Sequence, residues 1–183
     1  MSVFAFFARF AHINSESLMD NLHAYWRMEY VSVPKEEREE ANPFVSLPNL
    51  GDDRKALLIH RSTHCYLVLN KFPYNAGHLL VVPYREVALL SDLDKEERID
   101  FMDMIIFAQE LLVRGLRPNA FNVGMNLGTE AGAGIPEHLH CHVVPRWKAD
   151  VNFMPVIAKT RVLPEALDVM WGKLSEQVAE MTV

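Results

Sequence analysis

The chain has 183 residues, half of them hydrophobic, and a formal net charge of -6. This size and apolar content fit one ordinary domain with its own core, and the acidic balance argues against a nucleic-acid surface, since such surfaces are usually basic. No apolar run approaches the ~20 residues that span a bilayer, and the Phe-rich start lacks the basic region of a signal peptide. We therefore expect neither nucleic-acid nor membrane partners.

The first part of the chain carries few structural signals. Residues 1–20 fit either a short amphipathic helix or a disordered N-terminal extension. Residues 42–53 contain two prolines and a glycine and predict a loop. No internal repeat or linker divides the rest of the chain, so we expect residues 21–183 to form a single domain.

Three strands are predicted in the middle of the chain. Residues 57–61 and 66–70 are apolar and rich in strand-forming residues, with a turn region between them. After a turn over 71–77, a third strand covers 78–82 and stops at Pro83. The connections are too short for parallel crossovers, so we expect these strands to be antiparallel.

A long helix is predicted next. Asp94 and Glu97 stand at capping-box spacing, and Gly115 is placed to end the helix. Its apolar residues recur at roughly helical intervals: Ile99, Met102, Ile105, Ile106, Ala108, Leu112 and Val113.

The last third of the chain predicts two strands and one helix. The strands cover 121–126 and about 137–144, where Pro145 ends the second one. Pro164 is placed at the first position of the final helix. That helix carries an apolar stripe of Leu167, Met170, Trp171, Leu174, Val178 and Met181. Antiparallel strands with interposed helices predict an α+β fold.

The stretch from His138 to Val144 carries the strongest functional signal. His138, His140 and His142 alternate with apolar residues, so on a strand all three imidazoles would share one face. Three interpretations are open: an ordinary strand that happens to contain histidines, a metal site, or a catalytic site. The first and last positions are roughly 13 Å apart on a strand, so the three rings cannot all bind one ion. Nucleophilic or acid-base catalysis is the interpretation we favour.

A loop rich in small residues precedes the histidines. Residues 128–134 include Gly132 and Gly134, and their backbone amides could bind an anion. An anion-binding loop beside a nucleophilic imidazole suggests phosphoryl or nucleotidyl transfer.

Two blocks of sequence resemble one family. Residues 138–144 match the His-φ-His-φ-His-φ-φ signature of the histidine triad superfamily, where φ is apolar, and residues 70–83 resemble its first block. The tail over 144–154 is similar to the dinucleoside polyphosphate branch, the fragile-histidine-triad-like hydrolases and related phosphorylases. The resemblance covers about residues 22–155. It implies a five-stranded antiparallel sheet with helices, paired into a ten-stranded sheet in a homodimer.

The resemblance also implies roles for the histidines. His140 would be the nucleophile that attacks the α-phosphorus, and His142 would contact a phosphate oxygen. His138 would support the strand and the nucleophile from behind. His78, from the first block, would be the fourth histidine of the site.

Further nucleotide-binding residues are implied by the same resemblance. Asn70 would lie near ribose or phosphate, Asn126 would hold phosphate or the leaving group, and Gly132 and Gly134 would supply amides. Some bacterial members bind structural zinc through positions that are here Asn42, Val45, Glu86 and His138, and one ligand does not make a site. We therefore expect no structural metal or bound cofactor, although Mg or Mn can accompany a polyphosphate substrate.

The predicted function is hydrolysis of an α-phosphate linkage in dinucleoside polyphosphates through a covalent nucleotidyl-histidine intermediate. The alternatives are a dinucleoside polyphosphate phosphorylase and a nucleotide-binding protein of low turnover. Water is favoured over phosphate as the acceptor because residues 132–135 carry no hydroxyl. The two cysteines, Cys65 and Cys141, form neither a CxxC pair nor a disulfide framework, so we expect a reducing, cytoplasmic setting.

Overall fold

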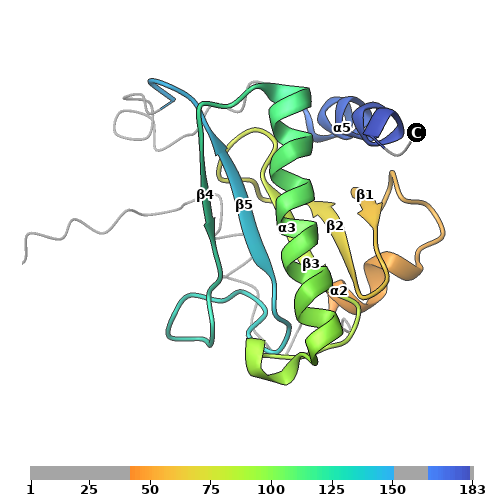
Figure 1. The fold of residues 1–183 in the computed structure, drawn as a ribbon, viewed down its shortest axis with the longest axis vertical. Helices are drawn as coiled ribbons and strands as arrows, with labels where there is room; N and C mark the ends of the chain where they lie inside the picture. Colours follow the sequence, from red (N-terminus) through yellow and green to blue (C-terminus); the bar gives the residue numbers. More distant parts are fainter. Residues whose placement is uncertain (1–41, 151–164, 182–183) are drawn as a thin grey trace, which may run out of the picture.

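The computed structural model describes residues 42–150 and 165–181 (Figure 1). The expected extension over 1–20, and with it the predicted start of the domain at residue 21, lies outside the described residues. The elements in chain order are α2 (Pro43–Ser46), η5 (Leu47–Asn49), β1 (Leu58–Arg61), β2 (Cys65–Leu69), β3 (Leu79–Pro83), η6 (Leu90–Asp92), α3 (Lys95–Leu116), β4 (Ala120–Gly124), β5 (Cys141–Arg146) and α5 (Leu167–Met181). Residues 42–53, predicted as a loop, therefore contain two short helical turns.

The five strands form one antiparallel sheet in the order β1-β2-β3-β5-β4. The α+β class, the strand number and the antiparallel pairing are as predicted. The first four strands lie within two residues of their predicted bounds. β5 lies between β3 and β4, and so the histidine segment enters the sheet near its middle.

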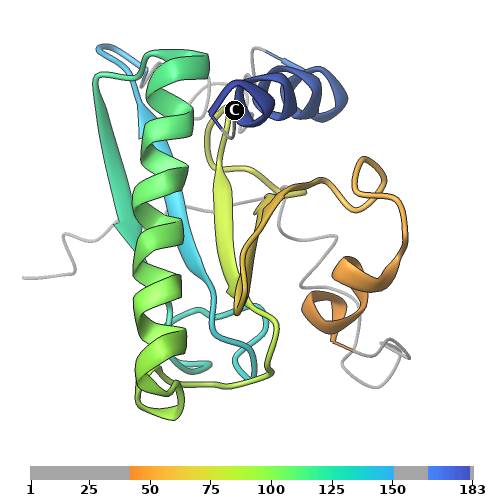
Figure 2. The same ribbon diagram turned by 45° about the vertical axis from the view of Figure 1, so that its right-hand side comes forward.

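Both faces of the sheet are covered. Alternate residues of β2 and β3 pack with α3 and α5 in one core cluster, which includes Leu67, Leu69, Leu79 and Val81. The other residues of the same strands pack on the opposite face with Phe44 of α2, in a cluster that includes Tyr66, Val68, Leu80 and Val82. Figure 2 shows α5 beside the C-terminal end of α3. All ten residues of β2 and β3 are buried for this reason.

The helix α3 begins as predicted and ends later than predicted. Asp94 and Glu97 form the expected capping box. The predicted end at Gly115 is wrong, because the helix continues to Leu116 and Arg117 supplies the left-handed cap. Gly115 serves a different purpose: a Cβ there would lie 3.2 Å from Leu174 Cδ2, so the glycine allows α5 to approach closely.

Apolar residues occupy two faces of α3, which the helical spacing alone did not separate. Of the predicted residues, Ile105, Ala108 and Leu112 are buried. About half of each remaining apolar side chain is exposed: Ile99 53%, Met102 56%, Ile106 48% and Val113 50%. The core face is completed by residues that the prediction omitted, namely Phe101, Met104 and Leu111.

The last helix keeps its predicted stripe and changes its start. α5 begins at Leu167, so Pro164 is not its first residue. Met170 and Leu174 are buried, and the indole of Trp171 donates a hydrogen bond to the backbone oxygen of Leu58 at 2.8 Å. Within the described ranges, none of the helices combines the length and hydropathy that a membrane crossing requires.

The bounds of the fifth strand differ most from the prediction. β5 starts only at Cys141, because the backbone of Leu139 donates to Val87 beyond β3 rather than to β3 itself. Pro145 does not end the strand. Its carbonyl accepts from Asn75 of a turn, and the N–H and C=O of one strand residue point to the same side. The nitrogen of Pro145 therefore points to the turn and not to β4, so the lack of an N–H at this residue costs no hydrogen bond between β4 and β5.

The capping carboxylate of α3 predicts acid sensitivity. Hydrogen bonds from Arg85, at 2.8 and 2.6 Å, lower the pKa of Glu97 from 4.5 to about 2. A folded-state pKa below the unfolded one stabilises the fold above about pH 4.5, and that stabilisation is lost as the pH falls toward about 2. Urea unfolding should show wild type and Glu97→Gln converging in stability between about pH 6 and about pH 3. A constant difference between them would contradict this origin.

Candidate active site

The three histidines share the sheet face that α3 does not cover. Leu139, Cys141 and Val143 belong to the α3 core cluster, so the alternate residues point the other way. The ring of Phe44 lies 5.5 Å from His138 and 5.0 Å from His140, and the rings of His140 and His142 are 5.1 Å apart. The predicted common face is confirmed, although His138 and His140 precede β5 rather than lie within it.

The hydrogen bond to a carbonyl fixes the tautomer of His140. Its Nδ1 lies 2.8 Å from the backbone oxygen of His138, and only a protonated nitrogen can donate to a carbonyl. The neutral ring therefore keeps its lone pair on Nε2. A lone pair on Nε2 is what a nucleophilic imidazole needs.

A backbone group also determines the tautomers of His78 and His142, which differ from that of His140. The backbone N–H of Tyr74 donates to His78 Nδ1 at 3.0 Å, so His78 carries its proton on Nε2. That Nε2 lies 3.0 Å from His142 Nδ1, which must then accept. His142 consequently presents a protonated Nε2, and the direction of both bonds follows from one backbone amide.

Burial keeps His78 neutral. The side chain is fully buried, and this burial, with a smaller effect of His142 and His140, lowers the pKa of His78 to about 3. Asn70, predicted to contact the nucleotide, lies with its Nδ2 3.3 Å from His78 Nδ1 and accepts from the backbone of Phe72. Tyr74 covers the same histidines, with its ring 4.6 Å from that of His78.

The positions compared with a zinc site hold a hydrogen-bonded cluster instead. Asn42 donates through Nδ2 to Glu86 at 2.9 Å and lies at the same distance from His138 Nδ1. The other nitrogen of His138 lies 2.9 Å from the backbone oxygen of Pro83. Val45 offers no ligand. In the described part of the chain, no three His, Cys, Asp or Glu side chains are grouped as metal ligands, so these residues do not fit a structural zinc ion.

This cluster predicts how the protein responds to metal removal. We expect no stoichiometric zinc by elemental analysis and no change in melting temperature on chelation. Asn42→Ala should instead destabilise the fold by about 1–2 kcal/mol, because it removes a helix cap and two side-chain contacts. About one zinc per chain, lost together with stability on chelation, would contradict the expectation.

The predicted anion-binding loop is partly occupied by its own turn. The amide of Gly132 donates to the backbone oxygen of Thr129 at 2.9 Å, and that of Ala133 donates to Gly128. The amide of Gly132 is thus used within the turn in this structure, and its role as a donor to an anion stays a prediction. Gly134 lies in the same loop, and Asn126 lies two residues beyond β4.

Sequence reasoning missed Phe44 and Tyr74, the two aromatic side chains beside the histidines. Phe44 lies in a segment predicted as a loop, and its only signal was a large apolar residue among turn-formers. Tyr74 lies in the block that resembles the family, and its backbone amide carries no sequence signal.

The comparisons with known proteins agree with this geometry. Residues 53–149 match the family model described as the HIT domain. The chain belongs to the HIT family. A relative from Mycobacterium tuberculosis named AP-4-A phosphorylase is 42% identical over an alignment of 157 residues that covers 81% of this chain and 80% of that one. An asymmetrical bis(5'-nucleosyl)-tetraphosphatase from Schizosaccharomyces pombe is 37% identical over 84 residues, 46% of each chain.

A solved HIT structure shows the same fold. The hypothetical histidine triad nucleotide-binding protein from Sulfolobus tokodaii superposes with a TM-score of 0.62, at 19% identity over 77% of this chain and 94% of that one. The sheet with its covering helices is thus the fold of the HIT family.

Proposed function

We propose that the protein cleaves dinucleoside polyphosphates, such as diadenosine tetraphosphate, through a nucleotidyl intermediate on His140. The observation that carries the proposal is the bond from His140 Nδ1 to the backbone oxygen of His138, which leaves the lone pair on Nε2. The names of the enzymes similar to this chain supply the substrate class.

The proposed reaction has two balanced steps. His140 Nε2 attacks the α-phosphorus, a P–N bond forms, and the P–O bond to the rest of the polyphosphate breaks. An acceptor oxygen then attacks the same phosphorus, the P–N bond breaks, and the lone pair returns to Nε2. The Nε2–H of His142 is suited to stabilise charge on a phosphate oxygen in both steps.

The remaining predicted residues have supporting roles in the proposal. His138 supplies the carbonyl that orients the nucleophile, and His78 orients His142. Asn70 and Asn126 are proposed to contact the nucleotide, with Gly134 as an amide donor. Mg or Mn would accompany the polyphosphate and neutralise its charge, without a site built from protein ligands.

Two observations favour different acceptors. The absence of a hydroxyl from residues 132–135 favours water. The phosphorylase relative matches four-fifths of the chain at 42% identity, whereas the tetraphosphatase matches under half of it. The match to the phosphorylase covers more of the chain at a higher identity, and we give this more weight than one missing hydroxyl. Phosphate is therefore the acceptor we propose, with water as the second candidate.

One experiment tests the reaction and its acceptor. Purified protein is incubated with diadenosine tetraphosphate, with and without phosphate, and the products are identified. Phosphorolysis gives ADP and ATP only with phosphate, whereas hydrolysis gives AMP and ATP in both cases. A protein that binds the nucleotide without turnover and without a trapped nucleotidyl-enzyme would be a binding protein, and the proposal would fail.

We further propose a cytoplasmic homodimer. The half-exposed apolar residues of α3 and the position of β4 at a sheet edge support pairing with a second copy. Both cysteines are buried free thiols, which supports a reducing compartment. Analytical ultracentrifugation would test the dimer, and a monomer at micromolar concentration would overturn it.

A further inference from the structure

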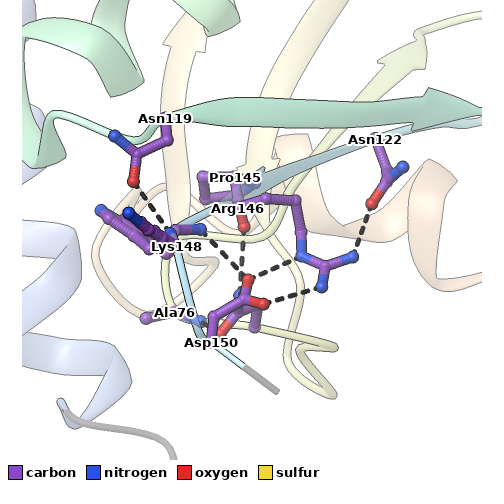
Figure 3. Close-up of polar contacts among 9 residues, drawn as sticks. Ala76, Asn119, Asn122, Pro145, Arg146, Lys148 and Asp150 are labelled. Atoms are coloured by element: carbon purple, nitrogen blue, oxygen red, sulfur yellow. Dashed lines mark hydrogen bonds and ion pairs between the residues drawn. The ribbon is translucent and has the colours of Figure 1, made fainter.

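A polar cluster joins the end of β5 to the turn that precedes His78 (Figure 3). Asp150 accepts hydrogen bonds from Arg146 at 2.7 and 2.8 Å, from the backbone of Trp147 at 3.1 Å and from Asn75 Nδ2 at 3.0 Å. Asn75 is 75 positions away in the chain. The cluster thus fixes a long-range contact beside the proposed active site.

The side chain of Asn75 is fully used in this contact. Its Nδ2 donates to Asp150 and, at 3.1 Å, to the backbone oxygen of Pro145. Its Oδ1 accepts from the backbone of Ala76 at 3.1 Å. Since both amide hydrogens and the oxygen have defined partners, the orientation of the amide is determined.

Asp150 is held as a charged acceptor. Its side chain is only 12% exposed, and the bonds from Arg146 lower the pKa of Asp150 to about 2. The carboxylate therefore stays ionised near neutral pH and holds Asn75 through a charge-assisted hydrogen bond.

Asn75 belongs to the same turn as the amide that orders the histidine protons. Its backbone oxygen accepts from the backbone of His78 at 3.2 Å, and the adjacent Tyr74 donates its N–H to His78 Nδ1. His78 in turn meets His142 on β5, the strand that also carries Pro145. The contacts form a closed ring, from β5 through the turn to His78 and back to β5.

We propose that Asn75, anchored by Asp150 and by the carbonyl of Pro145, is a positioning residue that sets the proton arrangement of His78 and His142. Within the described residues, the side-chain hydrogen bonds of Asn75 join it to Asp150, Pro145 and Ala76 and not to His142, so it acts through the Tyr74 amide. The proposal rests on the proposed function where catalysis is concerned, while the proton positions can be observed without it.

The structure supplies a matched control. Asn119 lies at the same end of the sheet, and its Oδ1 accepts from the backbone of Lys148 at 2.9 Å. It has the same side chain as Asn75 and ties the same chain segment, but no bond of its side chain reaches the turn in the described structure. Figure 3 shows it on the far side of the cluster from Asp150.

The kinetic test compares Asn75→Ala with Asn119→Ala, using diadenosine tetraphosphate and phosphate. We expect Asn75→Ala to lower kcat roughly 10-fold to 100-fold with KM within about threefold, because misplaced catalytic groups slow the reaction without loss of substrate contacts. Asn119→Ala should stay within about twofold of wild-type kcat. Equal losses in the two variants would overturn the proposal.

A double-mutant cycle separates positioning from general stability. If Asn75 acts through His78, then Asn75→Ala should lower kcat no further in a His78→Ala background, although it still lowers the melting temperature. Additive losses in kcat would overturn the proposal. Asn75→Ser serves as a second variant should the alanine variant not fold. Its hydroxyl can still accept from the backbone of Ala76, while the two amide N–H groups that bind Asp150 and Pro145 are lost.

Histidine tautomers give a readout that does not depend on turnover. In ¹⁵N-histidine NMR spectra, wild type and Asn119→Ala should show His78 and His142 protonated at Nε2 alone, and Asn75→Ala should show mixed or exchanging tautomers. Unchanged tautomers in Asn75→Ala would overturn the inference even if the enzyme is active. An inactive wild type with the expected spectra would overturn the proposed function and leave the inference standing.

Discussion

His140→Asn should abolish turnover while the protein remains folded. The asparagine Nδ2 can take the place of the ring Nδ1 and still donate to the backbone oxygen of His138, so little stability is at stake. No nucleophile remains, and losses of this kind are about 10⁴-fold or more. The two measurements are the rate of product formation from diadenosine tetraphosphate and the melting temperature.

The control is the same substitution at His142. His142→Asn removes charge stabilisation but not bond formation, so it should lose less activity, on the order of 10²-fold to 10³-fold. A labelled nucleotidyl-enzyme should still be trapped with His142→Asn and never with His140→Asn. Retention of activity within about tenfold in His140→Asn would show that another group is the nucleophile.

Gly77→Ala should cost about 2–4 kcal/mol of folding free energy. Gly77 has φ +70, which any side chain adopts only with strain, and its Cβ would lie 2.4 Å from Leu116 Cδ1 and 3.2 Å from Leu112 Cδ2. Since the next residue is His78, displacement of the turn should also reduce kcat. Urea unfolding and steady-state kinetics measure the two effects.

Gly51 is the matched control for that substitution. It has nearly the same dihedral, φ +71, but no heavy atom lies within 4 Å of the position its Cβ would take. Gly51→Ala should therefore show the cost of the backbone conformation alone, about 1–2 kcal/mol, with kcat unchanged. If the two variants are equally stable, the contact with α3 contributes nothing.

The parts of the fold that depend on local chemistry could be predicted. Short turns between apolar runs determine an antiparallel sheet, and the capping pair Asp94 and Glu97 determines where α3 begins. The alternating histidines indicated one functional face, because strand geometry has a period of two. These features need only neighbours in sequence.

The predictions of where β5 and α3 end were wrong because residues distant in the sequence determine those ends. Pro145 looked like a strand end, yet Asn75 covers its carbonyl side and the strand continues. Gly115 resembles a residue that ends a helix, yet it lies within α3, where its lack of a side chain leaves room for Leu174 of α5. The resemblance compared Asn42 and His138, 96 positions apart, with ligands of one zinc site, but nothing in the sequence showed that their side chains would contact each other directly.

The placement of β5 between two partners restricts how this part of the chain can vary in length. His142 lies opposite Leu80 of β3 and opposite Gly124 of β4 at once. One inserted or deleted residue would exchange the face of His142 with that of Val143, a core residue, and would do so against two ladders. Length changes should therefore be tolerated in the 128–134 loop and abolish folding between 140 and 143, a contrast that a single-residue insertion scan would display directly.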